Sequence, residues 1–111
     1  MELADTTLQL PSDGEIHIEG TGSLTGTAST IEAASVSLGI DSTLSQSESG
    51  LGLTVDADVA WVCQTTRVSQ NVDILGNFLI QPGCEVEILD GRVGGTVTAL
   101  TGFKTDTPIF P

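Results

Sequence analysis

Short runs of β-branched and aliphatic residues that alternate with polar ones dominate this chain, and they constrain its fold more than any other feature. A period of two predicts strands, because successive side chains of a strand point to opposite faces. Gly, Asp, Asn and Ser interrupt the runs and predict turns. The pattern predicts about ten short strands, at residues 7–10, 15–19, 23–27, 30–38, 51–55, 59–63, 72–75, 77–81, 84–89 and 95–100.

These strands predict an all-β fold, which is either a β-sandwich of the jelly-roll kind or a short β-solenoid. In the run 30–38 the alternation slips at Ala33 and Ala34, which predicts a bulge or bend there. Asp90 and Gly91 predict a turn, either in a hairpin or at a solenoid corner.

The 111 residues fit one domain. We expect a single β domain over residues 13–100, an N-terminal arm over residues 1–12 and a C-terminal arm over residues 101–111. The C-terminal arm ends in Pro and Phe residues, and we expect one of the arms to pack on a neighbouring subunit.

Fifteen acidic residues against three basic ones give a formal charge of -12. Binding to nucleic acid needs clustered cations, so we predict no nucleic-acid partner. Anionic membranes are repelled by the same charge, and the sequence has no apolar run long enough for a transmembrane helix, so we predict no membrane partner. Cys63 and Cys84 have neither the spacing of a redox motif nor that of a zinc site. We expect both to be buried free thiols, with a disulfide as the alternative.

His17 is the only histidine, and on a strand it shares a face with Glu15 and Glu19. Such a face can bind a metal only if other segments add ligands, so His17 and Glu19 are weak metal candidates. Asp56 and Asp58 are weak candidates as well, because they could contribute oxygen ligands for calcium. The simpler interpretation is the polar outer face of a strand. Serine or cysteine nucleophiles would all depend on this one histidine as their base. We therefore predict no catalytic residues, no enzyme activity and no cofactor.

Apolar residues that could bind a partner subunit lie in the second half of the chain. Trp61 stands among aliphatic residues and is expected either in the core or at an interface. The other interface candidates belong to the C-terminal arm, and they are Phe103, Ile109 and Phe110.

Two stretches resemble known proteins in composition. The first is "IHIEGTGSLTGTASTIEAASVSLG", which looks like the β-helical segments of phage tail spikes and fibres. The second is "VDILGNFLIQPGCEVEILDGRVGGTVTAL", which looks like coils of a β-solenoid, a style also seen in bactofilin-like polymers. The chain departs from bactofilins in lacking a regular short Gly-Val repeat, and from membrane-piercing spikes in lacking a His-x-His tip.

The resemblance implies a structural assembly protein of a virion, such as a capsid decoration, head-fibre or tail protein. Such a protein would act as a homo-oligomer within a larger assembly such as a capsid, with cytoplasmic location as the alternative. Two other functions stay open. One is a small acidic binding module for carbohydrate or a cationic surface, with or without calcium, and the other is a bactofilin-like solenoid polymer.

Overall fold

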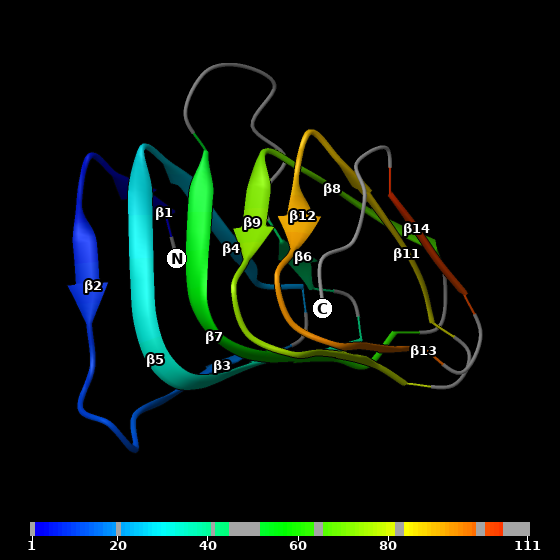
Figure 1. Cartoon of the computed structure of the whole chain (residues 1–111), viewed down its shortest axis with the longest axis horizontal. Helices are drawn as coiled ribbons and strands as arrows, with labels where there is room; N and C mark the ends of the chain where they lie inside the picture. Colours follow the sequence, from blue (N-terminus) through cyan, green and yellow to red (C-terminus); the bar gives the residue numbers. More distant parts are fainter. Residues whose placement is uncertain are drawn as a thin grey trace.

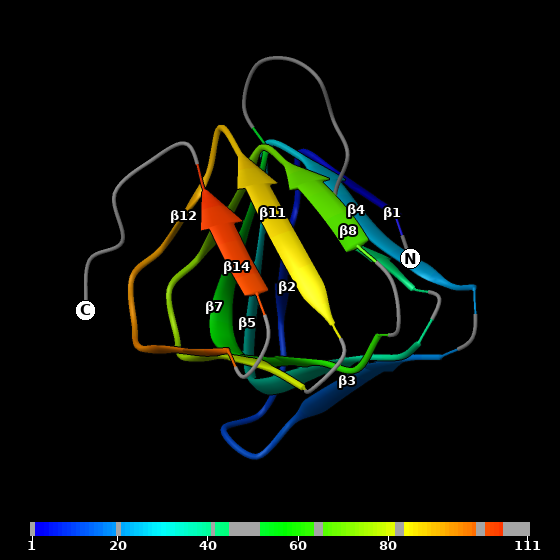
Figure 2. The same cartoon turned by 90° about the vertical axis from the view of Figure 1, so that its right-hand side faces the viewer.

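A computed structural model shows the chain wound into a short β-solenoid with three faces (Figures 1 and 2). The structure describes residues 2–19, 21–40, 42–44, 52–63, 66–81, 84–99 and 102–105. Every strand pairing among them is parallel. The all-β prediction and its solenoid form are therefore confirmed. The sandwich alternative is wrong, because it requires antiparallel sheets.

Each turn of the solenoid, here called a rung, adds one strand segment to each face. The first face contains β1 (Glu2–Ala4), β4 (Ser23–Thr27), β6 (Thr43–Leu44), β8 (Thr66–Gln70), β11 (Glu85–Leu89) and β14 (Gly102–Thr105). The second face contains β2 (Thr7–Gln9), β9 (Val72–Ile74) and β12 (Arg92–Val93), together with the first halves of β5 (Ser29–Leu38) and β7 (Leu53–Trp61). The third face contains the second halves of β5 and β7 together with β3 (Glu15–Ile18), β10 (Phe78–Ile80) and β13 (Val97–Ala99).

Strand alternation builds the core, because every second side chain points into the solenoid. In β7 buried and more exposed residues alternate along the whole strand. Stacked rungs place these inward residues in columns, and one such column contains Val36, Val59 and Phe78, all buried. Parallel pairing in register places each inward side chain directly next to an inward side chain of the next rung. Aliphatic side chains pack well in such columns.

One corner of the solenoid repeats an unusual backbone conformation. The corner between the first and second faces contains Asp5, Ala28, Asn71 and Asp90, which all have positive φ between 49° and 58°. The strand register on either side shows that these residues occupy the same corner in different rungs. Asn and Asp tolerate this left-handed conformation, whereas Ala28 is strained by its Cβ. The turn predicted at Asp90 is therefore a solenoid corner and not a hairpin.

Several strands differ from their predicted extents. The bulge predicted at Ala33 and Ala34 is confirmed, because the register between β5 and β7 shifts between Glu32 and Ser35. Residues 53–55 and 59–61, which belong to two separate predicted runs, are parts of one continuous strand, β7. Fourteen strands occur in the described residues, and the ones without a predicted run are β1, β6, β8, β12 and β14.

The segments expected as arms contribute strands to the solenoid. Residues 1–12 contain β1 and β2, which pair with β4 and β5. From the C-terminal segment, β14 pairs with β11, while residues 106–111 lie outside the described residues. Among the residues that the structure describes, no helix is long and apolar enough to span a membrane.

Candidate functional site

The first rung has a neighbour on one side only. β1, β2 and β3 pair with strands of the second rung, and no described strand lies on their other side (Figure 1). On β2, the Leu10 N–H donates to the Glu32 carbonyl and the Thr6 carbonyl accepts from Thr30 N–H. Backbone groups alternate in direction along a strand, so those of Thr7 and Gln9 point away from the solenoid. This edge is a free template for another strand.

Apolar side chains of this first rung are incompletely covered. The half-buried residues that pack against the core there are Leu3, Leu8, Leu10 and Ile18. One rung further in, Leu24 and Ile31 are 0% exposed and Leu38 is 2% exposed. The difference arises because no described rung covers the first one. Among the described residues, the hydrophobic core is therefore only partly covered at the first rung.

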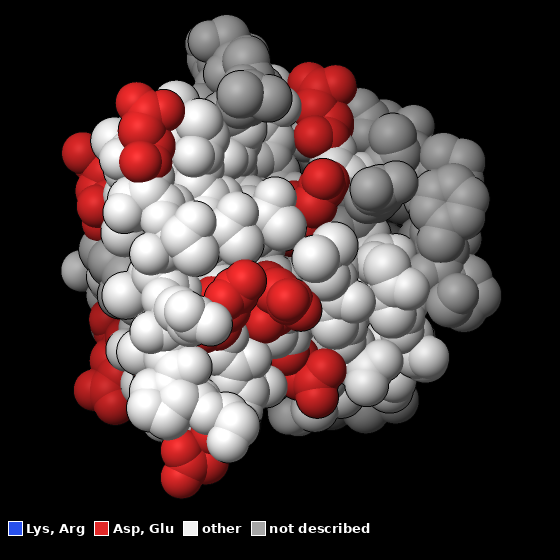
Figure 3. All heavy atoms as spheres, turned by 60° about the vertical axis from the view of Figure 1, so that its left-hand side comes forward, with Lys and Arg blue, Asp and Glu red and all other residues white. Residues whose placement is uncertain are grey.

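The same end is strongly acidic. Its exposed carboxylates belong to Glu2, Asp5, Asp13, Glu15 and Glu19. Figure 3 shows acidic side chains spread over this end and the adjoining face, with no described Lys or Arg side chain among them. An open strand edge, half-exposed leucines and negative charge therefore coincide on one surface, which we call the N-terminal end surface and define by β1, β2, β3 and residues 10–14.

His17 lies on β3 at this surface. Its Nε2 is 3.4 Å from Glu15 Oε2, and the two side chains are 57% and 59% exposed. Ile16 between them is buried, so the prediction of a polar outer strand face is confirmed. The register brings Ser37 of β5 opposite His17, but no hydrogen bond joins these two described residues. Glu19 is exposed just beyond the end of β3.

The other two metal candidates, Asp56 and Asp58, lie on different faces of the solenoid. Asp56 is opposite Glu32 on the second face, beside a shallow pocket of about 390 Å³ that Gln9 and Ser12 also line. Asp58 begins the third face, where its Oδ1 accepts a hydrogen bond of 2.9 Å from the Asn77 N–H. Within the described residues, no three His, Cys, Asp or Glu side chains come close enough together to hold a metal ion.

Asp58 belongs to a polar ladder that follows one corner across three rungs. Asn77 repeats its role on the next rung, because Asn77 Oδ1 accepts a hydrogen bond of 3.0 Å from the Thr96 N–H. Gly76 precedes Asn77 at this corner, and a Cβ there would overlap the carbonyl oxygen of Ala57. The ladder thus satisfies backbone N–H groups where the chain turns, which is a structural role.

The third face carries a groove of about 450 Å³ next to this ladder. Its polar lining comes from outward residues of four successive rungs, which are Ser35, Ser37, Asp58, Asn77, Thr96 and Thr98. Leu79, 38% exposed, adds an apolar side chain. Hydroxyl, amide and carboxylate groups beside an apolar side chain suit a polar ligand such as a sugar. The sequence pattern did not reveal this groove, because the residues come from separate strands.

The predicted interface residues have different positions. Trp61, for which the sequence left both a core and an interface position open, is 0% exposed and lies in the core of the solenoid. Its aliphatic neighbours along the chain were the correct signal. Phe103 lies in β14, on the last described rung, while Ile109 and Phe110 lie outside the described residues.

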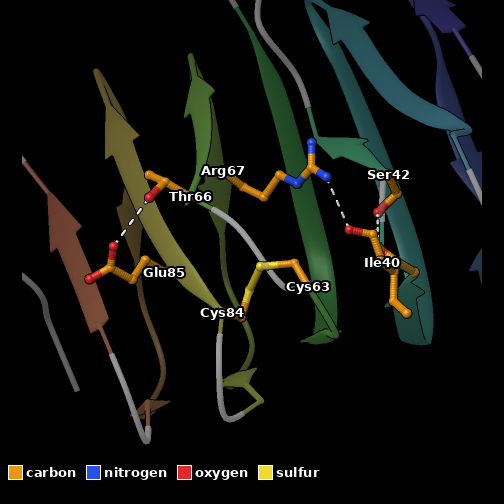
Figure 4. Close-up of a disulfide and its surroundings, with 8 residues drawn as sticks. Ile40, Ser42, Cys63, Thr66, Arg67, Cys84 and Glu85 are labelled. Carbon is orange, nitrogen blue, oxygen red and sulfur yellow. Dashed lines mark hydrogen bonds between the residues drawn. A yellow bond between two sulfur atoms is a disulfide. The ribbon is translucent and has the colours of Figure 1, made fainter.

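Cys63 and Cys84 form a disulfide, so the expectation of free thiols is wrong (Figure 4). Their Cα atoms are 4.6 Å apart and both residues are buried. Cys63 follows β7 and Cys84 precedes β11, so the bridge joins neighbouring rungs. The sequence separation of 21 is close to the 19 residues between register partners such as Val59 and Phe78. The length of one rung therefore explains the pairing, although the irregular rung lengths hide this repeat in the sequence.

Hydrogen bonds next to the disulfide also link neighbouring rungs (Figure 4). The Arg67 guanidinium donates from Nη2 to the Ile40 carbonyl at 3.1 Å, and Thr66 Oγ1 donates to Glu85 Oε2 at the same distance. These contacts connect β8 with the turn before β6 on one side and with β11 on the other.

No protein-family model, no curated protein and no solved structure matches this chain.

Proposed function

We propose that this protein is a structural assembly protein of a virion, such as a capsid decoration, head-fibre or tail protein, and that it acts as a homo-oligomer. The observation that carries the proposal is the N-terminal end surface, where an unpaired strand edge and a half-exposed end of the core coincide. Proteins usually block or cover such an edge, so an open one favours pairing with another chain.

The mechanism is strand addition to this edge. Backbone groups that point away from the solenoid form ladder hydrogen bonds with the incoming strand. The half-buried side chains Leu3, Leu8, Leu10 and Ile18 become fully covered, and each such side chain contributes about 1 kcal/mol. The acidic outer faces stay in water, where like charge keeps finished particles apart.

The disulfide supports a location outside the reducing cytosol. Disulfides persist in oxidising surroundings, which include virion surfaces, and are rare in proteins that stay in the cytosol. The Cys63–Cys84 bridge therefore favours the virion over the cytoplasmic alternative. It also stabilises the folded domain, because it restricts the unfolded chain.

Light scattering coupled to size exclusion tests the proposal. We expect the mass to rise above the 11.4 kDa of one chain as the protein concentration increases. A protein that stays monomeric at every concentration, and that does not join purified particles from its source, would contradict the proposed function.

The groove on the third face favours a second candidate, a binding module for carbohydrate. Its polar lining crosses four rungs and could bind a chain of sugar units with hydroxyl, amide and carboxylate groups. Calorimetric titration with a panel of oligosaccharides tests this function, with Thr98→Val in the groove as the weakened variant and Thr7→Val outside the groove as its control. Binding that Thr98→Val does not weaken, or no binding at all, would remove this candidate.

A further inference from the structure

We propose that the groove on the third face binds an extended polysaccharide without acidic groups, and that this ligand runs along the solenoid axis with successive sugar units above successive rungs. This inference rests on the second proposed function, carbohydrate binding, and names the class of the ligand and its direction. It depends on the columns of side chains that line the groove, on their unused hydrogen-bonding groups and on the charge of the groove.

Two columns of outward side chains line the groove and follow the solenoid axis. The first column consists of Ser35, Asp58, Asn77 and Thr96. The second column lies two residues further along each strand and consists of Ser37, Ala60, Leu79 and Thr98. Neighbouring rungs are about 4.8 Å apart, so each column of four residues is about 14 Å long. The length of one sugar unit in an extended chain is close to this spacing, so a chain along the axis can repeat its contacts from rung to rung.

The first column presents polar groups that the fold already holds in place. Asp58 Oδ1 accepts a hydrogen bond from the Asn77 N–H, and Asn77 Oδ1 accepts one from the Thr96 N–H. Each bond uses only one of the two polar atoms at the end of the side chain. The second carboxylate oxygen of Asp58 can therefore accept from a ligand hydroxyl, and the amide nitrogen of Asn77 can donate to one. Side chains that are already ordered lose little conformational freedom when a ligand binds.

The second column places hydroxyl groups on either side of an apolar centre. In the described part of the chain, the hydroxyl groups of Ser37 and Thr98 make no hydrogen bond. Between them lie Ala60 and Leu79, and Leu79 is 38% exposed. A sugar ring with equatorial hydroxyls is divided in the same way, because its faces carry C–H groups and its rim carries hydroxyls. Such a ring can pack one face on Leu79 while its rim contacts the polar column.

Charge decides against acidic polysaccharides. Asp58 brings a carboxylate to the groove, and no Lys or Arg is among the described residues that line it. The whole chain has a formal charge of -12. A glycan with carboxylate or sulfate groups would therefore be repelled, whereas a glycan without them can donate its hydroxyls to Asp58.

Calorimetric titration with β-1,4-linked glucose oligomers, from the disaccharide to the hexasaccharide, tests the direction. These oligomers are extended and their hydroxyls are equatorial. The affinity should rise several-fold with each added unit up to the tetrasaccharide and then level off, because four rungs line the groove. An affinity that stops rising at the disaccharide would overturn a ligand that follows the axis.

Variants at the two ends of the groove provide a second test of the direction. Ser37→Ala and Thr98→Val each remove one outward hydroxyl, and the two residues lie three rungs apart. Each variant alone should weaken the tetrasaccharide to about the affinity of the trisaccharide for the wild-type protein. The matched control is Thr54→Val on the second face, outside the groove, and it should bind like the wild type. If only one end variant weakens the tetrasaccharide, the proposed direction is wrong. Far-UV circular dichroism verifies that each variant is folded.

The ligand class is tested with the same tetrasaccharide after its primary hydroxyl groups have been oxidised to carboxylates. The oxidised form should bind several-fold more weakly, and the difference should shrink as salt screens the repulsion. Equal or tighter binding of the oxidised form would overturn the exclusion of acidic glycans but leave carbohydrate binding standing. If no oligosaccharide of any kind binds, both this inference and the carbohydrate-binding function are wrong, while the assembly function is judged separately by light scattering.

Discussion

Removing the Cys63–Cys84 bridge should destabilise the solenoid through its unfolded state. The variant Cys63→Ala with Cys84→Ala deletes the covalent link between two neighbouring rungs and leaves the strand register unchanged. In the folded protein, the parallel strands β7, β8, β10 and β11 already hold these rungs together. The main effect should therefore be the freedom that the unfolded chain gains.

The expected size follows from the loop that the bridge closes. With a sequence separation of 21 between the two cysteines, the loss of the cross-link restores entropy worth about 3 kcal/mol at room temperature. Both side chains are at most 2% exposed, so replacing two sulfur atoms with hydrogen leaves a small cavity that costs about 1 kcal/mol more. The free energy of unfolding should fall by about 4 kcal/mol in total.

Urea unfolding followed by tryptophan fluorescence measures this change, because Trp61 is fully buried next to the bridged segment. The protein should be kept at concentrations where light scattering shows a monomer, so that assembly does not add to stability. Wild-type protein refolded in the presence of a reductant serves as the matched control. It loses the cross-link but keeps both sulfur atoms, and should therefore lose about 3 kcal/mol.

The m value, which is the slope of the unfolding free energy against urea concentration, shows whether the bridge acts on the unfolded or on the folded state. A chain without the bridge exposes more surface when it unfolds, so the m value should rise while the midpoint falls. A loss below about 1 kcal/mol with an unchanged m value would refute the reasoning. Two free thiols per chain in a thiol titration of the denatured, non-reduced protein would refute the bridge itself.

Three further predictions concern single residues, all measured by urea unfolding of the monomer. Ala28→Asn should raise the free energy of unfolding by about 0.5 to 1 kcal/mol, because Asn tolerates the φ of 51° that strains alanine; a loss of stability would contradict the corner assignment. Gly76→Ala should lower it by more than about 2 kcal/mol, because the added Cβ overlaps the Ala57 carbonyl, and a neutral result would show that the rungs do not approach this closely. His17→Ala should change it by less than about 0.5 kcal/mol, since both side chains of its contact with Glu15 are well exposed, and a larger loss would indicate a structural role for this histidine.

The alternation of apolar and polar residues in the sequence correctly predicts the positions of many strands. The run at 23–27 corresponds to β4 residue for residue, and the slip at Ala33 and Ala34 marks the register shift in β5. The exposure of His17 beside a buried Ile16 also follows from alternation alone. These features are predictable because a strand that is buried on one face imposes a period of two on its own residues, whatever strand it pairs with.

The strands that escaped prediction lack this local signal. β6 and β12 contain two residues each, too few to show any period. In β8 the exposed Val68 and the fully buried Ser69 reverse the usual pattern of apolar residues inside and polar residues outside. Whether such a residue is buried or exposed depends on the side chains of the neighbouring rungs and not on the strand's own sequence.

The sequence by itself determined that the chain is all-β, where most strands lie, and which of their side chains face inward, because alternation and turn residues act over a few neighbouring positions. Only the tertiary structure decided that the strands are parallel, that Cys63 and Cys84 meet, that Trp61 lies in the core, and that the first described rung combines exposed carboxylates with half-covered leucines. The reason is the irregular length of the rungs. Register partners are 23 residues apart between Glu2 and Thr25, 20 between Ser23 and Thr43, and 19 between Phe78 and Val97. A repeat that varies in this way is not visible in the sequence, and it becomes evident only when the rungs stack.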